Sequence, residues 1–508
     1  MASSSLPDIW AWIQSLPPIT DWKSNSMSIT ICSSLSPYSS LKLTANKNPH
    51  NTTPNVIFFI LADFHLPISL WTSNPLKLGS KSSKLADEDT VFQLFHTVII
   101  GVLNYAPIKN TTYLKPHISR ASSDPQNMFN LAFYTLMLLV CIYEAPQDLR
   151  FGYLNTLKHH LTGSKSREAS KLLMRVLGSN LEEQWMRSLN LAITNWTIEL
   201  QASPLSLKTP SPLFSYALST VGMWKVQLYC PIIAMDVEKT SNPCQDERLF
   251  FSLMYQQLEG VVQLGYRTIF RDNWVELVVN VDNIRCDVIP LASEILMAER
   301  GIGAEEKHFP SRVSLQITPI IQTNVLSVSV SKSSDNPTRE IGMEKTIEGS
   351  FDPPTSLGLK LSAGETITMT LKPWKFEQSV QANSVNLNWF LHDSINGREV
   401  FSSKPPKMAL FQPKAWFKDR YASIYRPFTK QGGVVFAGDE YGDSVLWKLD
   451  KQVVGKTMEW EIRGWIWLTY WPNKHRTFYS ETRRIRGKST TESSLAGVGF
   501  FVLSRICR

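Results

Sequence analysis

The sequence lacks most of the short motifs by which enzymes and metal proteins are usually found. Its six cysteines are scattered and form no Cys-x-x-Cys pair, so neither a zinc site nor a disulfide framework is expected. No Gly-x-Ser-x-Gly, His-Glu-x-x-His or Cys–His signature of a hydrolase is present. We therefore expect no cofactor and no bound metal. We also favour a protein without enzymatic activity, although catalytic groups need only converge in space.

The chain also lacks a convincing transmembrane segment, which needs about 20 apolar residues. Residues 55–71 are interrupted by Asp63, His65 and Pro67, and the apolar run from Phe129 to Tyr143 is only 15 residues long. No secretion signal is evident. These absences predict a soluble, intracellular protein of the cytoplasm or nucleus.

The first 50 residues are rich in Ser, poor in acidic residues and without Arg. Two interpretations stay open for them. A Ser-rich, acid-poor segment is typical of a plastid transit peptide, but such peptides are normally rich in Arg. Alternatively, Ile9, Trp12, Ile13 and Leu16 recur at helical spacing and predict a short helix that docks on the rest of the molecule.

The composition is that of a globular protein. The chain has 508 residues, of which 43% are hydrophobic and 19% charged, which excludes wholesale disorder. A chain of this length exceeds the size at which one hydrophobic core usually splits, so two or three domains are expected.

The first half of the sequence has helical signals. Asp124 is a suitable N-cap before Pro125, and Gly163 and Gly178 mark two helix ends. Ser179 to Glu182 fits a capping box at the start of the next helix. That helix carries a single apolar stripe made of Leu181, Trp185, Leu189, Ile193, Trp196 and Leu200.

The second half has strand signals. A segment rich in Pro and Ser follows residue 203, and after it apolar and polar residues alternate, as in 311–330 and 364–374. Asn396-Gly397 suits a hairpin turn, and one helix is expected at 245–260. We therefore predict an α+β chain: a helical N-terminal domain followed by a mainly antiparallel β, sandwich-like C-terminal domain. The predicted divisions are a partly ordered N-terminal segment (1–85), a helical domain (86–203), a linker (204–215), a mainly β domain (216–486) and a tail (487–508).

Three weaker motifs have simpler structural explanations. Gly301 and Gly303 lack the third Gly and the Lys of a phosphate-binding loop. The adjacent His159 and His160 point about 100° apart on a helix and cannot bind one metal together. Asp439, Glu440 and Asp443 would give calcium only a partial shell, so a turn is the better interpretation.

Basic and aromatic residues are enriched together near the C-terminus. Residues 404–488 contain 17 Lys and Arg against 8 Asp and Glu, a net charge of +9, while the whole chain has only +8. Such mixtures bind single-stranded nucleic acid by stacking and phosphate contacts, and they are attracted to anionic lipid surfaces. Trp and Tyr are, however, first of all core and interface residues.

Within this region, residues 458–486 predict a β-hairpin. Alternate residues from Met458 to Tyr470 form a complete apolar face, and the intervening residues from Glu459 to Trp471 form a mixed one. "RTFYSETRR" (476–484) is the expected returning strand. The aromatic and basic residues without a structural explanation form our candidate binding patch: Arg463, Trp465, Trp467, Trp471, Arg476, Arg483 and Arg484.

The same hairpin, in "GWIWLTYWPNK" and "FYSETRR", resembles the C-terminal part of a family of uncharacterised plant proteins. The resemblance covers about 30 residues and implies no known activity, so it transfers no site.

These observations predict a non-enzymatic interaction or scaffold protein with a basic, aromatic C-terminal surface and an unidentified protein partner. One alternative is binding of nucleic acid or anionic lipid through residues 404–488. The other is an enzyme whose site lies between the two domains, where clefts usually form.

Overall fold

The protein is described here from a computed structural model of residues 1–508. The described residues are 6–33, 40–48, 55–63, 66–77, 88–107, 124–199, 213–220, 222–240, 243–293, 296, 299, 306–330, 339–345, 365–371, 374–393, 398–399, 434–437, 444–456, 458–470 and 477–490. The predicted turn at Asn396-Gly397, the motifs at Gly301 and Asp439, and all of residues 404–433 in the basic region lie outside these residues.

Helices lie mostly in the first half of the chain. They are α1 (Ile9–Ser15), η1 (Ile19–Asp21), α2 (Glu88–Leu103), α3 (Pro125–Glu144), α4 (Gln147–Leu161), α5 (Ser164–Glu199), η2 (Ile232–Ala234), α6 (Glu247–Met254) and η3 (Lys451–Val453). As predicted, Asp124 caps α3 by accepting a hydrogen bond from Asn127 N, and Pro125 is its first residue. Gly178, with φ +73°, interrupts α5 where a helix end was predicted.

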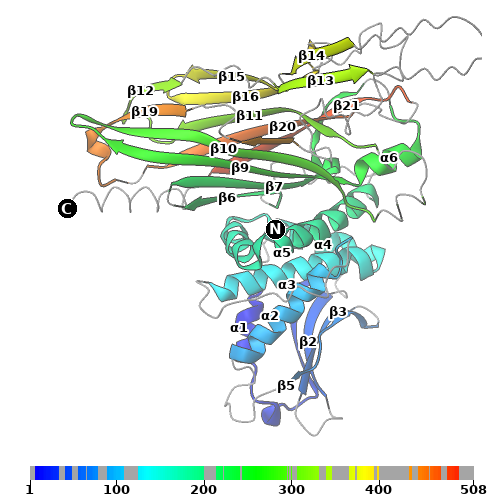
Figure 1. The fold of residues 1–508 in the computed structure, drawn as a ribbon. Helices are drawn as coiled ribbons and strands as arrows, with labels where there is room; N and C mark the ends of the chain where they lie inside the picture. The colour runs from blue at the N-terminus through cyan, green and yellow to red at the C-terminus, as the bar shows by residue number, and fades with distance from the viewer. Residues whose placement is uncertain are drawn as a thin grey trace, which may run out of the picture.

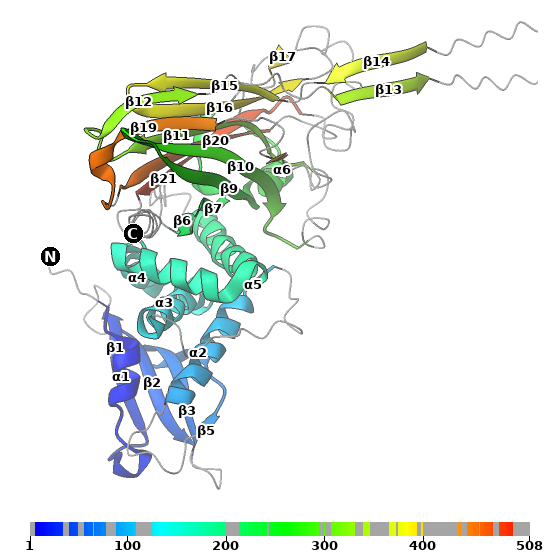
Figure 2. The same ribbon diagram turned by 60° about the vertical axis from the view of Figure 1, so that its left-hand side comes forward.

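An antiparallel sheet precedes the main helices. Its strands are β1 (Ser26–Ser33), β2 (Ser40–Asn48), β3 (Asn55–Asp63), β4 (Ile68–Thr72) and β5 (Leu76–Lys77), in the order β1-β2-β3-β4 with β5 paired to β3. The helix α1 packs on α2 and α3, with Ile9, Trp10 and Ile13 buried and the Trp10 ring 5.4 Å from that of Phe129, so a docked helix is present at the N-terminus. Figure 2 shows the sheet at one end of the molecule with the helices lying against it.

Two seven-stranded antiparallel sheets make up most of the second half. The inner sheet has the order β12-β19-β10-β9-β7-β6 with β18 on β10, and the outer sheet has the order β15-β16-β11-β20-β21-β8 with β17 on β16. The inner-sheet strands are β6 (Ser215–Thr220), β7 (Met223–Pro231), β9 (Gln256–Phe270), β10 (Trp274–Pro290), β12 (Val325–Val330), β18 (Val434–Ala437) and β19 (Ser444–Asp450). The outer-sheet strands are β8 (Asp236–Thr240), β11 (Phe309–Pro319), β15 (Trp374–Gln381), β16 (Ser384–Asp393), β17 (Arg398–Glu399), β20 (Trp460–Tyr470) and β21 (Glu481–Thr490).

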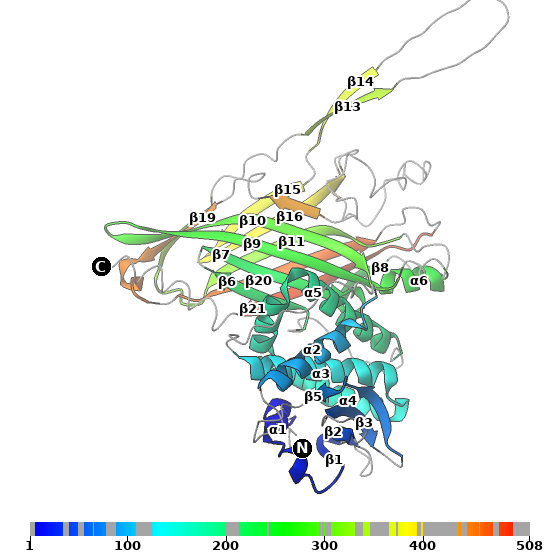
Figure 3. The same cartoon turned by 60° about the horizontal axis from the view of Figure 1, so that its bottom comes forward.

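The remaining two strands, β13 (Arg339–Lys345) and β14 (Glu365–Leu371), form a sheet of their own. Figure 3 shows this pair projecting away from the stacked sheets. The chain enters the pair after β12, on the inner sheet, and leaves it into β15, on the outer sheet.

The predicted fold class is wrong. Residues 26–77, expected to be a partly ordered segment before a helical domain, form a five-stranded sheet, and three large antiparallel sheets dominate the described chain. The strands of this first sheet were missed because β1 has a largely exposed first half, and Ser, Thr and Lys interrupt the apolar residues of β1 and β2. The helix expected at 245–260 is also shorter than predicted, because Gln256 already begins β9.

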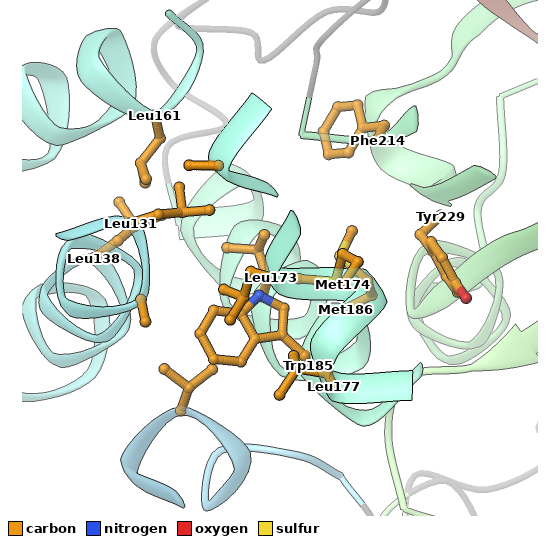
Figure 4. Packing of buried hydrophobic residues seen from close by; sticks show 14 of the residues in the cluster. Leu131, Leu138, Leu161, Leu173, Met174, Leu177, Trp185, Met186, Phe214 and Tyr229 are labelled. Carbon is orange, nitrogen blue, oxygen red and sulfur yellow. The ribbon is translucent and has the colours of Figure 1, made fainter. Parts of the chain in front are cut away.

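The helices form a layer between the first sheet and the inner sheet (Figure 1). Large side chains from α3, α4 and α5 meet in this layer, with Trp185 at its centre, and Phe214 and Tyr229 reach it from the inner-sheet side (Figure 4). The predicted stripe on α5 is confirmed, since Leu181, Trp185 and Leu189 are all buried. One hydrophobic core therefore extends from the first sheet to the outer sheet.

Polar contacts join α5 to the inner sheet. Arg187 forms an ion pair with Glu259 at 2.7 Å, and the Asn190 side chain donates to the carbonyl of Tyr229 at 3.2 Å. The Tyr216 hydroxyl donates to the buried carboxyl of Glu182. Glu182 was predicted as part of a capping box, and in the structure its carboxyl accepts from Tyr216.

Between the two stacked sheets the core is aromatic. The Trp447 and Trp460 rings lie 4.8 Å apart, edge to face, and Trp389 is fully buried. A cavity of about 30 Å³ also lies between the sheets, lined by Val226, Leu228, Val262 and Ser215 from the inner sheet and Val313, Leu315, Ile462, Gly464, Ile466 and Ile485 from the outer sheet. That is room for about one water molecule, so this cavity is not a ligand site.

One described helix, α3, is long and apolar enough to cross a membrane. However, 78% of its most apolar window is buried inside the molecule, as in the central helix of a packed core.

Candidate functional site

The strand β20 separates its side chains as its sequence alternation predicted. Trp460, Ile462, Ile466 and Leu468 are buried between the sheets, and Tyr470 is buried against Leu249 and Leu253 of α6. The intervening Arg463, Trp465 and Trp467 are partly exposed on the far side of the outer sheet. Figure 1 shows that this far side points away from the helical layer.

The structure divides the seven residues of the candidate patch. Arg463, Trp465, Trp467 and Arg484 share the exposed face of the outer sheet, because Trp467 pairs with Arg484 in the β20–β21 register. Arg483 faces the opposite way and is only 6% exposed. Trp471 and Arg476 lie outside the described residues.

A residue that the sequence patterns did not single out, Arg312, completes the exposed face. On β11 it pairs with Trp467 of β20 on one side and with Phe390 of β16 on the other. Its guanidinium carbon lies 4.3 Å from the Trp467 ring centroid and 4.7 Å from that of Phe390. The strand alternation of residues 311–317 is enough to put Arg312 on the other face of β11 from Val313. It does not show that Arg312 lies beside these two rings.

Most charges around Arg312 are already paired. Glu238 of β8 accepts a hydrogen bond from Trp467 Nε1 at 2.6 Å and forms an ion pair with Arg484 at 2.9 Å. Arg463 pairs with Glu461 at 2.6 Å. The Nε groups of Arg312, Arg463 and Arg484 are all buried without an acceptor in the described part of the chain, and Arg312 differs from the other two only in having no ion pair there. Burial lowers the pKa of the Arg312 guanidinium, and the charges of Glu238 and Glu377 offset this only in part.

On the inner side, Arg483 belongs to a buried polar cluster where the strands β9, β11 and β21 begin. Its Nε donates to Glu481 Oε1 at 2.7 Å, and its NH1 donates to the carbonyl of Ile232 at 3.1 Å. The same Glu481 carboxylate is bonded to His308 and accepts from the Tyr479 hydroxyl at 2.5 Å. Gln256 closes the cluster, since its Oε1 lies 3.0 Å from His308 Nδ1.

The charges of this cluster shift the pKa values of its members. Burial alone raises the pKa of Glu481, but the hydrogen bonds and charges of His308 and Arg483 outweigh it and hold the pKa well below the ordinary value. Burial and the neighbouring Glu481 raise the pKa of Tyr479 far above its ordinary value. Because the members of the cluster are hydrogen-bonded to one another, we interpret it as a structural cluster that holds the strands together rather than as a site open to a substrate.

The histidine pair considered in the sequence analysis does not form a metal site with other residues. His159 and His160 lie in the last turn of α4, where basic side chains favour the helix C-terminus. No group of three or more His, Cys, Asp or Glu that could hold a metal ion occurs among the described residues.

The hairpin β13–β14 has a regular polar–apolar pattern. In its register Ile341 lies opposite Met369 and Met343 lies opposite Ile367. At the intervening positions, Thr occupies 366, 368 and 370 of β14, opposite Glu344, Gly342 and Glu340 of β13. Alternate positions of a strand belong to opposite faces, so one face of this pair is apolar in sequence at its middle, with Arg339, Lys345 and Glu365 at its ends, and the other face is polar.

No family model and no curated protein matches this chain. Two solved structures are similar to it over 55% of its length and 92% of their own, each with a TM-score of 0.18. One is described as a pore-forming protein and is 10% identical. The other is the NetB toxin of Clostridium perfringens in its membrane-inserted form and is 8% identical.

These neighbours correct one expectation. Both are described as pore-forming proteins, which conflicts with the expected description of a soluble, intracellular, protein-binding protein and gives no support to a plant source. A TM-score of 0.18 carries nothing further over to this chain. The predicted scaffold role, its alternatives and the resemblance to a plant family are not tested by these findings.

Proposed function

We propose that this protein acts on lipid bilayers and inserts the β13–β14 hairpin into them. One observation supports the proposal: in the middle of the hairpin the register puts Ile341 and Met343 opposite Met369 and Ile367, while the alternate positions hold only Glu, Gly and Thr. The charged Arg339, Lys345 and Glu365 of the first set lie at the two ends of the pair. Strands that cross a bilayer have this pattern, with an apolar set facing lipid and a polar set facing water.

The length of the pattern is also suitable. The described strands have seven residues each, and a membrane strand needs about 9 to 11. The sequence before β14 continues the alternation, since Leu357, Leu359 and Leu361 occupy odd positions and Ser356, Gly358, Lys360 and Ser362 occupy even ones. The odd apolar positions thus extend from 357 to Leu371, interrupted only by Glu365.

The place of the hairpin in the fold favours the same function. A two-stranded pair is at best marginally stable in water on its own, and β13 and β14 pair with no other described strand. In hydrocarbon the open edges of one hairpin would leave backbone groups unbonded. Insertion therefore requires several copies of the chain whose hairpins close into a ring.

The test is release of a trapped dye from lipid vesicles, compared between variants of neighbouring residues on one strand. Met369→Arg places a charge in the apolar set, at a cost of about 2–4 kcal/mol at the bilayer centre. We expect release to fall at least about tenfold. Thr368→Arg puts the same charge in the polar set and should reduce release far less.

Leu326→Arg is the matched control outside the hairpin, since Leu326 on β12 is 57% exposed and the substitution adds the same charge to an apolar surface position. It should release dye as the wild type does. Two outcomes contradict the proposal: no release by the wild type from any vesicle, or equal losses for the Arg variants at 368 and 369.

A further inference from the structure

The guanidinium of Arg312 lies between two aromatic rings, contributed by the strands on either side of β11. A guanidinium is planar, and its N–H groups all point outward in that plane. Rings that cover its faces leave the edge as the part that can bind another group. Arg312 is thus a cation held between two aromatic rings on the exposed face of the sheet.

The charges of two carboxylates, Glu238 and Glu377, act on Arg312, but neither forms an ion pair with it. Glu238 is bonded to both Trp467 and Arg484. Among the described residues Arg312 forms no ion pair, whereas Arg463 and Arg484 on the same face each have one. Its Nε is buried without an acceptor, as are those of Arg463 and Arg484, so that atom does not distinguish it. An oxyanion that binds from solution or from a surface would supply Arg312 with the missing counter-ion.

The shape of the donor set limits the chemistry of that anion. The guanidinium edge offers parallel N–H groups that match two oxygens of one phosphate or carboxylate. Beside it, Trp465, Trp467 and Phe390 are partly exposed. Trp side chains of this kind are enriched at the boundary between lipid and water, where one end of the ring is apolar and the other is hydrated.

Arg312 and its two rings, Phe390 and Trp467, lie near the β13–β14 hairpin. Phe390 pairs with Lys375 at the start of β15, four residues after the last residue of β14, Leu371. Arg312 is likewise close to the start of β11, which begins at Phe309. The cation and its rings therefore lie near the end of the outer sheet at which the hairpin joins it.

We infer that Arg312, held between Phe390 and Trp467, binds the phosphate group of an anionic lipid headgroup. The inference rests on the proposed action on bilayers and specifies the lipid that the body of the protein recognises. It assigns the contact to one side chain, whereas general attraction to a negative surface would be shared by all exposed cations of this face.

The experiment measures flotation of the full chain with vesicles of phosphatidylcholine, with or without phosphatidylglycerol. Arg312→Gln should weaken binding to the anionic vesicles at least tenfold. Arg312→Lys keeps the charge but loses the planar edge, and it should recover only part of the binding. Arg486→Gln is the matched control, because Arg486 is exposed and pairs with Trp465 on the same face. It should change binding less than twofold.

Equal losses for the Gln variants at 312 and 486 would show general electrostatic attraction and overturn the inference, as would unchanged binding by Arg312→Gln. Inorganic phosphate, added at constant ionic strength, separates the two sources of phosphate. Weak competition fits a lipid headgroup, and complete displacement at low phosphate would assign the site to a soluble phosphate compound instead. Thermal unfolding of each variant, measured alongside, distinguishes lost binding from lost folding.

Flotation and dye release also separate this inference from the proposed function. Met369→Arg should float like the wild type while releasing little dye. If the wild type floats in an Arg312-dependent manner but releases no dye, insertion is wrong and the headgroup site stands. If dye is released and Arg312→Gln floats normally, insertion stands and the headgroup site is wrong.

Discussion

The ring nitrogen Nε2 of His308 lies 2.7 Å from Oε1 of Glu481, and both side chains are buried. His308 directly precedes β11, and Glu481 is the first residue of β21, so this contact joins two strand starts within the outer sheet. Gln256, at the start of β9, extends the connection to the inner sheet. The cluster therefore fixes how the two sheets meet at this end.

Replacing Glu481 should destabilise the protein strongly. Glu481→Gln leaves Arg483 buried without its counter-ion, and breaking a buried pair in this way costs about 3–5 kcal/mol. Urea unfolding followed by circular dichroism measures the loss. The control is Glu168→Gln on α5, which removes an exposed i,i+3 pair with Lys171 and should cost less than about 1 kcal/mol. Similar losses for both variants would contradict a structural role for the cluster.

The contribution of Glu481 should depend on pH in one direction. Its pKa in the folded chain lies below the ordinary value of 4.5, so the folded state favours the carboxylate. The stabilisation is therefore complete above pH 4.5 and is lost as the pH falls from there through the folded pKa. The difference in unfolding free energy between wild type and Glu481→Gln should shrink across that acidic range. If the difference in unfolding free energy instead grows on acidification, the inferred direction of the Glu481 pKa shift is wrong.

Glu182 should behave in the opposite way. Burial raises the pKa of its carboxyl above 4.5, although the hydrogen bond from Tyr216 lowers it in part. The protonated form is thus favoured in the fold, and stability is lost as the pH rises from 4.5 through the folded pKa. Glu182→Gln keeps an acceptor for Tyr216 and cannot ionise. We expect the variant to be more stable than the wild type at pH 8 and similar at pH 4, as judged by thermal unfolding at each pH.

Gly178 should be difficult to replace for a reason of backbone conformation alone. Its φ of +73° and ψ of 165° lie in a region that is essentially confined to glycine, and nothing lies within 4 Å of the position that a Cβ would occupy. Gly178→Ala should therefore cost about 1–3 kcal/mol of unfolding free energy. Gly265 on β9 has equally open surroundings but no positive φ, so Gly265→Ala should be neutral or slightly stabilising. Equal effects at the two positions would exclude the backbone explanation.

Local rules in the sequence were sufficient for several elements. The start of α3 at Asp124-Pro125 follows from capping chemistry, and the interruption of α5 at Gly178 follows from the freedom of glycine. The two faces of β20 follow from strand alternation, which depends only on backbone geometry. Each of these features is decided by residues a few positions apart, so one sequence contains the necessary information.

Pairing between distant strands decided the rest. The sequence grouped Arg483 with Arg484, but the covered side of β21 places Arg483 in a buried cluster and Arg484 on the surface. Arg312 was overlooked because its rings come from Phe390 and Trp467, which only the register of the outer sheet brings beside it. The sequence alone determined which residues of a strand lie on the same face. The tertiary structure decided which face is covered and which cation is left unpaired, because burial and charge pairing depend on the neighbours that folding supplies.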